Sequence, residues 1–168
     1  MENNKQKTEK YIPTGVPYGF GGWLTLFRIG LLFSILAFGK FIVVEIVPNF
    51  SNEDYKILTN PVSELYNPLY STFIITELIT NIFLLSFCIL LLILCQLQKK
   101  LFPKLSILFL GLNIVFIVIE IAFLGYIDNA ITDTFHENIF GIIKAIAIAG
   151  IWIPYLLLSK RVKNTFTE

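Results

Sequence analysis

Four long apolar stretches, separated by short polar segments, dominate the pattern of the chain. A helix rises about 1.5 Å per residue, so about 20 apolar residues cross a bilayer core of about 30 Å. The fourth stretch, residues 139–158, has this length and holds one charged residue, Lys144. The pattern predicts an all-α, integral membrane four-helix bundle. Its spans are expected at about 23–47, 69–97, 103–127 and 135–158.

Local polar signals mark where these helices begin. Thr134-x-x-Glu137 is a capping box, which predicts the start of the fourth span. Asn67-Pro68 offers an N-cap followed by a proline in the first turn, which predicts the start of the second span. Acidic and polar residues after Pro48 predict a short interfacial helix over about 51–58, in the first external loop.

The basic residues predict how the spans are oriented. The leader, the second connection and the tail carry three Lys or Arg residues each, whereas the first and third connections carry only Lys56. By the positive-inside rule both termini lie in the cytoplasm. We therefore divide the chain into a disordered cytoplasmic leader (1–20), a transmembrane domain (21–159) and a basic cytoplasmic tail (160–168).

The composition is typical of a membrane protein, and few residues suggest a catalytic or metal-binding site. Hydrophobic residues make up 55% of the chain, and its mean hydropathy is +0.73. Cys88 and Cys95 lie on one helical face about 10 Å apart, too far for a mutual disulfide, and serve as small apolar fillers. The single His136 and the scattered acids show no metal-ligand spacing, and no nucleotide-binding or hydrolase motif occurs. We expect no enzyme, no cofactor, no metal and no nucleic-acid partner.

Charged residues inside the first span lie near its ends. Arg28 is about one and a half turns from the start, and Lys40 and Glu45 are near the other end. Long side chains in such positions can reach the headgroups, so snorkelling is the simplest interpretation of all three.

Deeper polar residues occur in the other three spans. Glu77 and Asn81 are one turn apart in the second span, Glu120 lies in the third and Lys144 in the fourth. An isolated charge at the bilayer centre costs about 2.5–3.5 kcal/mol on insertion scales. We therefore predict a shared cluster in the outer half of the membrane, with Lys144 between the two carboxylates and Asn81 nearby. Two interpretations stay open: a structural clasp between helices, and a site for an ion, a proton or a ligand.

Small residues form a stripe on the fourth span. Gly141, Ala145 and Ala149 are spaced by four, so another helix could approach this face closely.

Five short segments together resemble a known family: Gly21-Gly22-Trp23-Leu24, Pro61-x-Ser63-x-x-Tyr66-x-Pro68, Phe102-Pro103, Ile151-Trp152-Ile153-Pro154-Tyr155 and the run from Ser159 to Phe166. They resemble a bacterial family of the domain-of-unknown-function type, family 2569, whose members look like small four-span inner-membrane proteins. The resemblance implies a multi-pass protein of the bacterial cytoplasmic membrane and no established activity. The signature residues are Gly22, Trp23, Trp152, Pro154, Tyr155, Lys160 and Arg161.

Two functions follow as hypotheses. The leading one is a non-enzymatic membrane module that binds a partner protein or a lipid, because the chain has a small-residue stripe and no catalytic motif. The alternative is a small transporter, or a protein that translocates ions or protons through Glu77, Glu120 and Lys144. Beyond the bilayer itself, the expected partners are a membrane protein or further copies of the chain.

Overall fold

The computed structural model describes residues 18–127 and 132–167, and for residues 127 and 132–138 only the backbone. Its elements are α1 (Trp23–Lys40), the π-helical η1 (Phe41–Ile46), α2 (Val47–Asn49), α3 (Glu53–Thr59), α4 (Pro68–Gln96), α5 (Leu101–Ile127), α6 (Thr132–Leu158) and α7 (Lys160–Thr165). Four stretches are long and apolar enough to cross a membrane: Trp23–Asn49, Pro68–Gln96, Leu101–Tyr126 and Ile139–Leu158. The predicted all-α membrane bundle is confirmed.

Two predicted helix starts can be compared with the structure. At α4 the side-chain oxygen of Asn67 accepts a hydrogen bond from the Leu69 amide at 2.9 Å, and Pro68 occupies the first turn, which confirms the predicted cap. α6 begins at Thr132, three residues before the predicted start, and the side chains of its capping box lie outside the described residues. In the first connection, α3 overlaps the predicted short helix.

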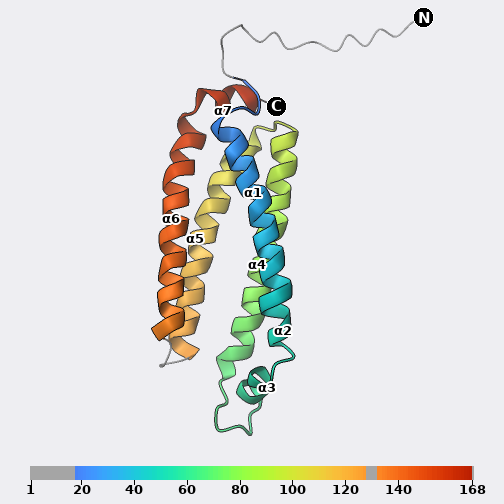
Figure 1. Ribbon diagram of the computed structural model, residues 1–168, viewed down its shortest axis with the longest axis vertical. Helices are drawn as coiled ribbons and strands as arrows, with labels where there is room; N and C mark the ends of the chain where they lie inside the picture. Colours follow the sequence, from blue (N-terminus) through green and yellow to red (C-terminus); the bar gives the residue numbers. More distant parts are fainter. Residues whose placement is uncertain (1–17, 128–131, 168) are drawn as a thin grey trace, which may run out of the picture.

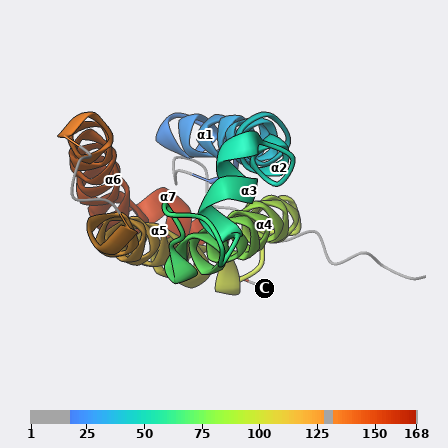
Figure 2. The same ribbon diagram turned by 90° about the horizontal axis from the view of Figure 1, so that it is seen from below.

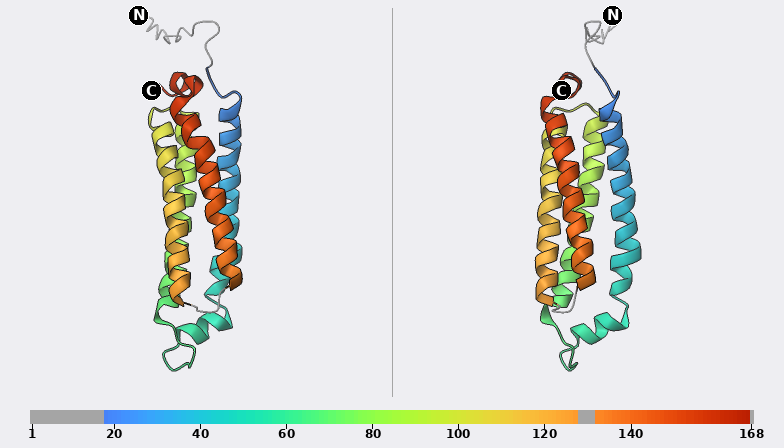
Figure 3. Two further views of the ribbon diagram at one scale, coloured as in Figure 1. Left: turned by 90° about the vertical axis from the view of Figure 1, so that its left-hand side faces the viewer. Right: turned by 60° about the vertical axis from the view of Figure 1, so that its left-hand side comes forward.

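The four long helices form a curved row rather than a closed square. α1 packs on α4, α4 on α5, and α5 on α6, as the view along the bundle shows (Figure 2). α7, the start of α1 and the α4–α5 turn lie at one end, the top of Figure 1, which we call the basic end because it carries Lys99, Lys100, Lys104, Lys160, Arg161 and Lys163. α3 lies at the opposite end, which we call the loop end (Figure 3).

At the basic end, aromatic side chains join the two outer helices of the row. The ring of Trp152 on α6 lies 4.9 Å from that of Phe27 and 6.1 Å from that of Trp23, both on α1. Phe102 on α5, which is fully buried, packs edge-on against Phe27 at 6.0 Å. Phe27 and Phe102 belong to the main hydrophobic core, and Trp152 packs against it, whereas Trp23 is 58% exposed. A smaller cluster around Ile46 and Phe73 lies at the loop end. The larger hydrophobic core therefore lies toward the basic end.

The predicted basic tail folds into the short helix α7, which covers the basic end. The hydroxyl of Ser159 caps it by accepting from the Val162 amide at 3.4 Å. Val162, Thr165 and Phe166 are buried, and the Phe166 ring stacks on Phe102 with 4.5 Å between centroids. The Thr165 hydroxyl also accepts a hydrogen bond from the Gly19 amide at 2.9 Å. The tail is thus part of the bundle, while most of the predicted leader lies outside the described residues.

Candidate functional site

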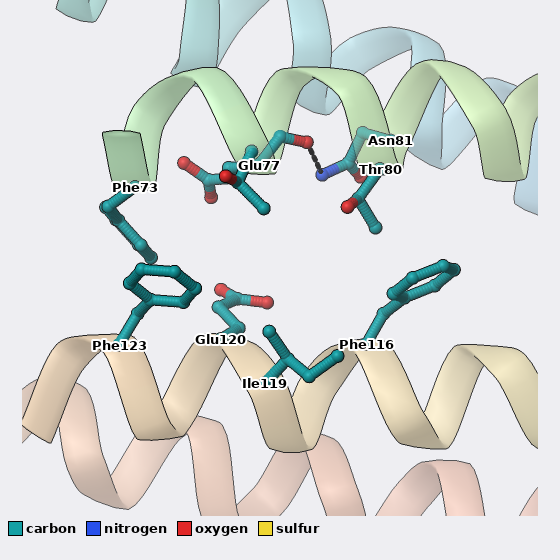
Figure 4. A pocket seen from close by; sticks show the side chains of 9 residues that line it. Phe73, Glu77, Thr80, Asn81, Phe116, Ile119, Glu120 and Phe123 are labelled. Carbon is teal, nitrogen blue, oxygen red and sulfur yellow. Dashed lines mark hydrogen bonds between the residues drawn. The ribbon is translucent and has the colours of Figure 1, made fainter. Parts of the chain in front are cut away.

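A cavity of about 90 Å³ lies between α4 and α5, in the half of the bundle toward the loop end. Aromatic side chains line its two ends, and polar side chains line the middle (Figure 4). α4 contributes Phe73, Thr76, Glu77, Thr80 and Asn81, and α5 contributes Phe116, Ile119, Glu120 and Phe123.

Helical spacing explains why both carboxyl groups enter this space. Glu77 lies seven residues before Leu84 and fourteen before Leu91, and both leucines are buried. Seven residues make almost two turns, so Glu77 shares their inward face. Glu120 follows Asn113 and the fully buried Ser106 at the same spacing on α5. Each glutamate therefore continues an inward-facing row toward the loop end.

Neither carboxyl group has a partner among the described residues. In Figure 4 the carboxyl groups of Glu77 and Glu120 both lie in the space between the two helices. No hydrogen bond or ion pair within the described part of the chain involves them. The Asn81 amide donates instead to the backbone oxygen of Glu77 at 2.9 Å. The cavity thus holds two acidic groups, and none of the side chains that the structure describes there is cationic.

Lys144 is placed differently from the expectation. Its side chain is exposed, and it does not line the cavity. α6 begins earlier than predicted, so Lys144 lies twelve residues into its helix, about 18 Å, whereas Glu120 lies seven residues from the end of α5, about 10 Å. The structure therefore brings together Glu77, Asn81 and Glu120, and leaves Lys144 outside this group.

The other predicted positions have simpler surroundings. Lys40 and Glu45 are exposed. In the small-residue stripe Ala149 is buried, and Ala145 and Gly141 are half-buried on the helix that packs on α5. A Cβ atom at Gly141 would meet no atom within 4 Å. Close helix approach therefore does not require a glycine at that position.

The signature residues, which are far apart in the sequence, mostly meet at the basic end. Gly22 has φ +61°, a conformation that favours glycine, and it places Trp23 at the start of α1. Trp23 contacts Trp152, and Trp152 contacts Tyr155 with 5.8 Å between ring centroids. A Cβ atom at Gly21 would collide with the guanidinium of Arg161. Pro154 and Lys160 are exposed, and Pro154 lies inside α6.

Comparison with known proteins places the chain in a family. A family model described as "Protein of unknown function (DUF2569)" matches residues 17–167. The chain belongs to this family. No curated protein and no solved structure matches it. The match and the four spans make this chain a DUF2569 membrane protein, and its signature residues lie toward the basic end of the bundle.

Sequence reasoning did not single out the other residues of the cavity. Thr76 and Thr80 flank Glu77 on α4, and Phe116 and Phe123 lie one turn on either side of Glu120 on α5. Hydroxyl side chains three residues from an intramembrane carboxylate share its helix face, and this spacing could have indicated Thr80.

Proposed function

We propose that this DUF2569 protein is a non-enzymatic binding protein of the bacterial inner membrane, with both termini in the cytoplasm. Its site is the cavity between α4 and α5, and its partner is a membrane protein that presents a cationic side chain to Glu77 and Glu120. The proposed orientation rests on the distribution of basic residues. The assignment to the bacterial inner membrane rests on the family resemblance.

The observation that carries the proposal is a pair of carboxyl groups, with no cation beside them among the described residues, inside the spans α4 and α5. A charged carboxylate within a bilayer is costly, and two in one cavity repel each other. A lysine or arginine from a partner helix would neutralise the pair and would supply hydrogen-bond donors to both groups.

The dimensions of the cavity favour a side chain over a metabolite. A volume of about 90 Å³ holds a few water molecules or one ammonium or guanidinium group. Pockets for drug-sized molecules have volumes of about 300–1,000 Å³. The apolar lining of the core beyond the cavity, toward the basic end, also supports binding over passage of a charged species through the bundle.

Native mass spectrometry of the protein, extracted gently from its own membrane, tests the proposal. We expect a stoichiometric protein adduct that is lost in Glu77→Gln and in Glu120→Gln. Glu45→Gln removes an exposed carboxylate from the first span and is the matched control, which should keep the adduct. An adduct that survives both cavity substitutions, or no adduct at all, contradicts the proposal.

Translocation of protons or cations is the second candidate function. Ser106, Asn113 and Glu120 form a row of polar residues at seven-residue spacing along the inward face of α5, the kind of row that can line a pathway. A clean homo-oligomer without adduct in the same experiment favours this function. Flux into proteoliposomes should then fall in Glu120→Gln, while the oligomer stays intact.

A further inference from the structure

A second hollow lies at the basic end of the bundle, on the side where α1 and α4 pack together. It is a groove of about 510 Å³, well separated along α4 from the acidic cavity. Apolar side chains form its walls: Ile29 and Leu32 from α1, and Leu92 and Ile93 from α4. Its polar residues are Thr25, Arg28 and Gln96.

Arg28 is held at the edge of this groove by two contacts. Its guanidinium donates to the side-chain oxygen of Gln96 at 2.8 Å and lies 4.2 Å from the centre of the Phe20 ring. Phe20 is fixed in turn because its backbone oxygen accepts a hydrogen bond from the Thr25 hydroxyl. A guanidinium has five N–H donors, and Gln96 uses one of them. Further donors are therefore available to an anion.

The anion is not supplied by the described part of the chain at this end. Residues 18–40, 78–119 and 139–167 contain no Asp or Glu, whereas the same segments carry Arg28, Lys40, Lys144 and the six basic residues of the basic end. Arg28 has no ion pair among the described residues. Charge complementarity therefore points to a negatively charged group from outside the described part of the chain.

We infer that this groove binds one anionic phospholipid of the leaflet at the basic end, with the phosphate at Arg28 and an acyl chain along Ile29, Leu32 and Ile93. The depth of Arg28 and Gln96 in the membrane fits a phospholipid. Arg28 lies five residues after Trp23, about 7 Å into α1, and Gln96 is the last residue of α4. Both polar groups therefore lie near the membrane surface, where lipid phosphates are, and the apolar walls continue inward from them.

The site is independent of the proposed partner site because the two share no residue. The test is native mass spectrometry of the full chain in detergent, with equal amounts of phosphatidylglycerol and phosphatidylcholine of the same chain length. We expect one phosphatidylglycerol to be retained in preference to phosphatidylcholine. Arg28→Gln should lower its apparent affinity about tenfold, because the charge-assisted hydrogen bonds to the phosphate are lost.

Two further variants make the outcome decisive. Lys104→Gln removes an exposed positive charge at the same end but outside the groove, and it should leave the affinity unchanged. Leu32→Trp keeps the guanidinium and fills the wall of the groove at a residue that is 53% exposed, so it should lower retention of both lipids. Equal losses in Arg28→Gln and Lys104→Gln would mean unspecific attraction to the basic end and would overturn the inference. It would also be overturned if Leu32→Trp kept full retention, or if the wild type showed no preference between the lipids.

Discussion

Removing the ring of Phe166 should release α7 from the basic end of the bundle. Phe166 is 6% exposed, and its ring stacks at 4.5 Å on Phe102, which is fully buried. Truncating a buried phenylalanine costs about 3–5 kcal/mol in a packed core. α7 has only six residues and lies at the edge of the core, so we expect a loss of about 2–3 kcal/mol in its docking. This corresponds to an undocked population about 30- to 150-fold larger.

Limited trypsin digestion in detergent measures that population. α7 contains Lys160, Arg161 and Lys163, and cleavage there follows the undocked fraction when redocking is faster than proteolysis. Loss of the C-terminal segment is read from the intact mass. Phe33→Ala is the control, because Phe33 is 67% exposed and the chemical change is the same.

A double-mutant cycle shows whether the stacked pair itself carries the effect. Aromatic pairs contribute about 0.5–1.5 kcal/mol beyond their burial, so Phe102→Ala and Phe166→Ala should be non-additive by that amount. Cleavage of Phe166→Ala at the rate of Phe33→Ala would refute the docking of α7. Strict additivity would refute the stacking contribution alone.

Three substitutions test other features by unfolding in denaturing detergent. Gly22→Ala should lower the free energy of unfolding by about 1–2 kcal/mol, because residue 22 adopts φ +61°. Gly30→Ala, in open space within α1, should instead raise it by up to about 1 kcal/mol. Equal effects of the two substitutions would contradict the argument from backbone conformation. Ser106→Ala should leave the stability unchanged or raise it by about 1 kcal/mol, because this buried hydroxyl has no hydrogen-bond partner among the described residues. Ser86→Ala is the comparison, because the Ser86 hydroxyl donates to a backbone oxygen. A larger loss of stability in Ser106→Ala than in Ser86→Ala would show that the Ser106 hydroxyl does form a hydrogen bond. Lys144→Met should fold and be at least as stable as the wild type, because the substitution removes an exposed charge from a membrane span. Failure to fold would show that Lys144 pairs with the carboxylates.

The sequence predicted the helices because membrane spans are governed by length and apolar content, which need no knowledge of tertiary contacts. The N-cap at Asn67 was equally local and is found in the structure. The start of α6 was predicted three residues too late because Thr134-x-x-Glu137 was interpreted as a capping box, whereas the helix already begins at Thr132 and includes these residues. The folding of the tail into α7 depends on Phe166 meeting Phe102, a contact between distant residues that local patterns do not reveal.

The candidate site could also be predicted in part, because some of its contacts are local in the sequence. Glu77 and Asn81 are one turn apart on a single helix, so their proximity follows from helical spacing alone. The meeting of Glu77 with Glu120 follows from the antiparallel hairpin of α4 and α5 and from similar distances to the loop end. Lys144 was expected in the same group because its depth was counted from the apolar run. α6 continues beyond the apolar run, so Lys144 lies twelve residues from the start of its helix; its side chain is exposed and does not line the cavity.

The two halves of this DUF2569 protein differ in the side chains that their helices turn inward. In the basic half, Trp23, Phe27 and Trp152 tie α1 to α6, and α7 covers the end, so the outer helices of the row are held together there. In the half toward the loop end, Glu77 occupies an inward position that leucines fill further along α4, and Glu120 occupies an inward position on α5. Carboxyl groups in place of core side chains weaken packing at that end unless something neutralises them. The aromatic contacts of the basic half can hold the row together while the acidic half remains open to the partner that we propose. Substitutions in the aromatic cluster should therefore affect folding, whereas Glu77→Gln and Glu120→Gln should affect binding in a protein that still folds.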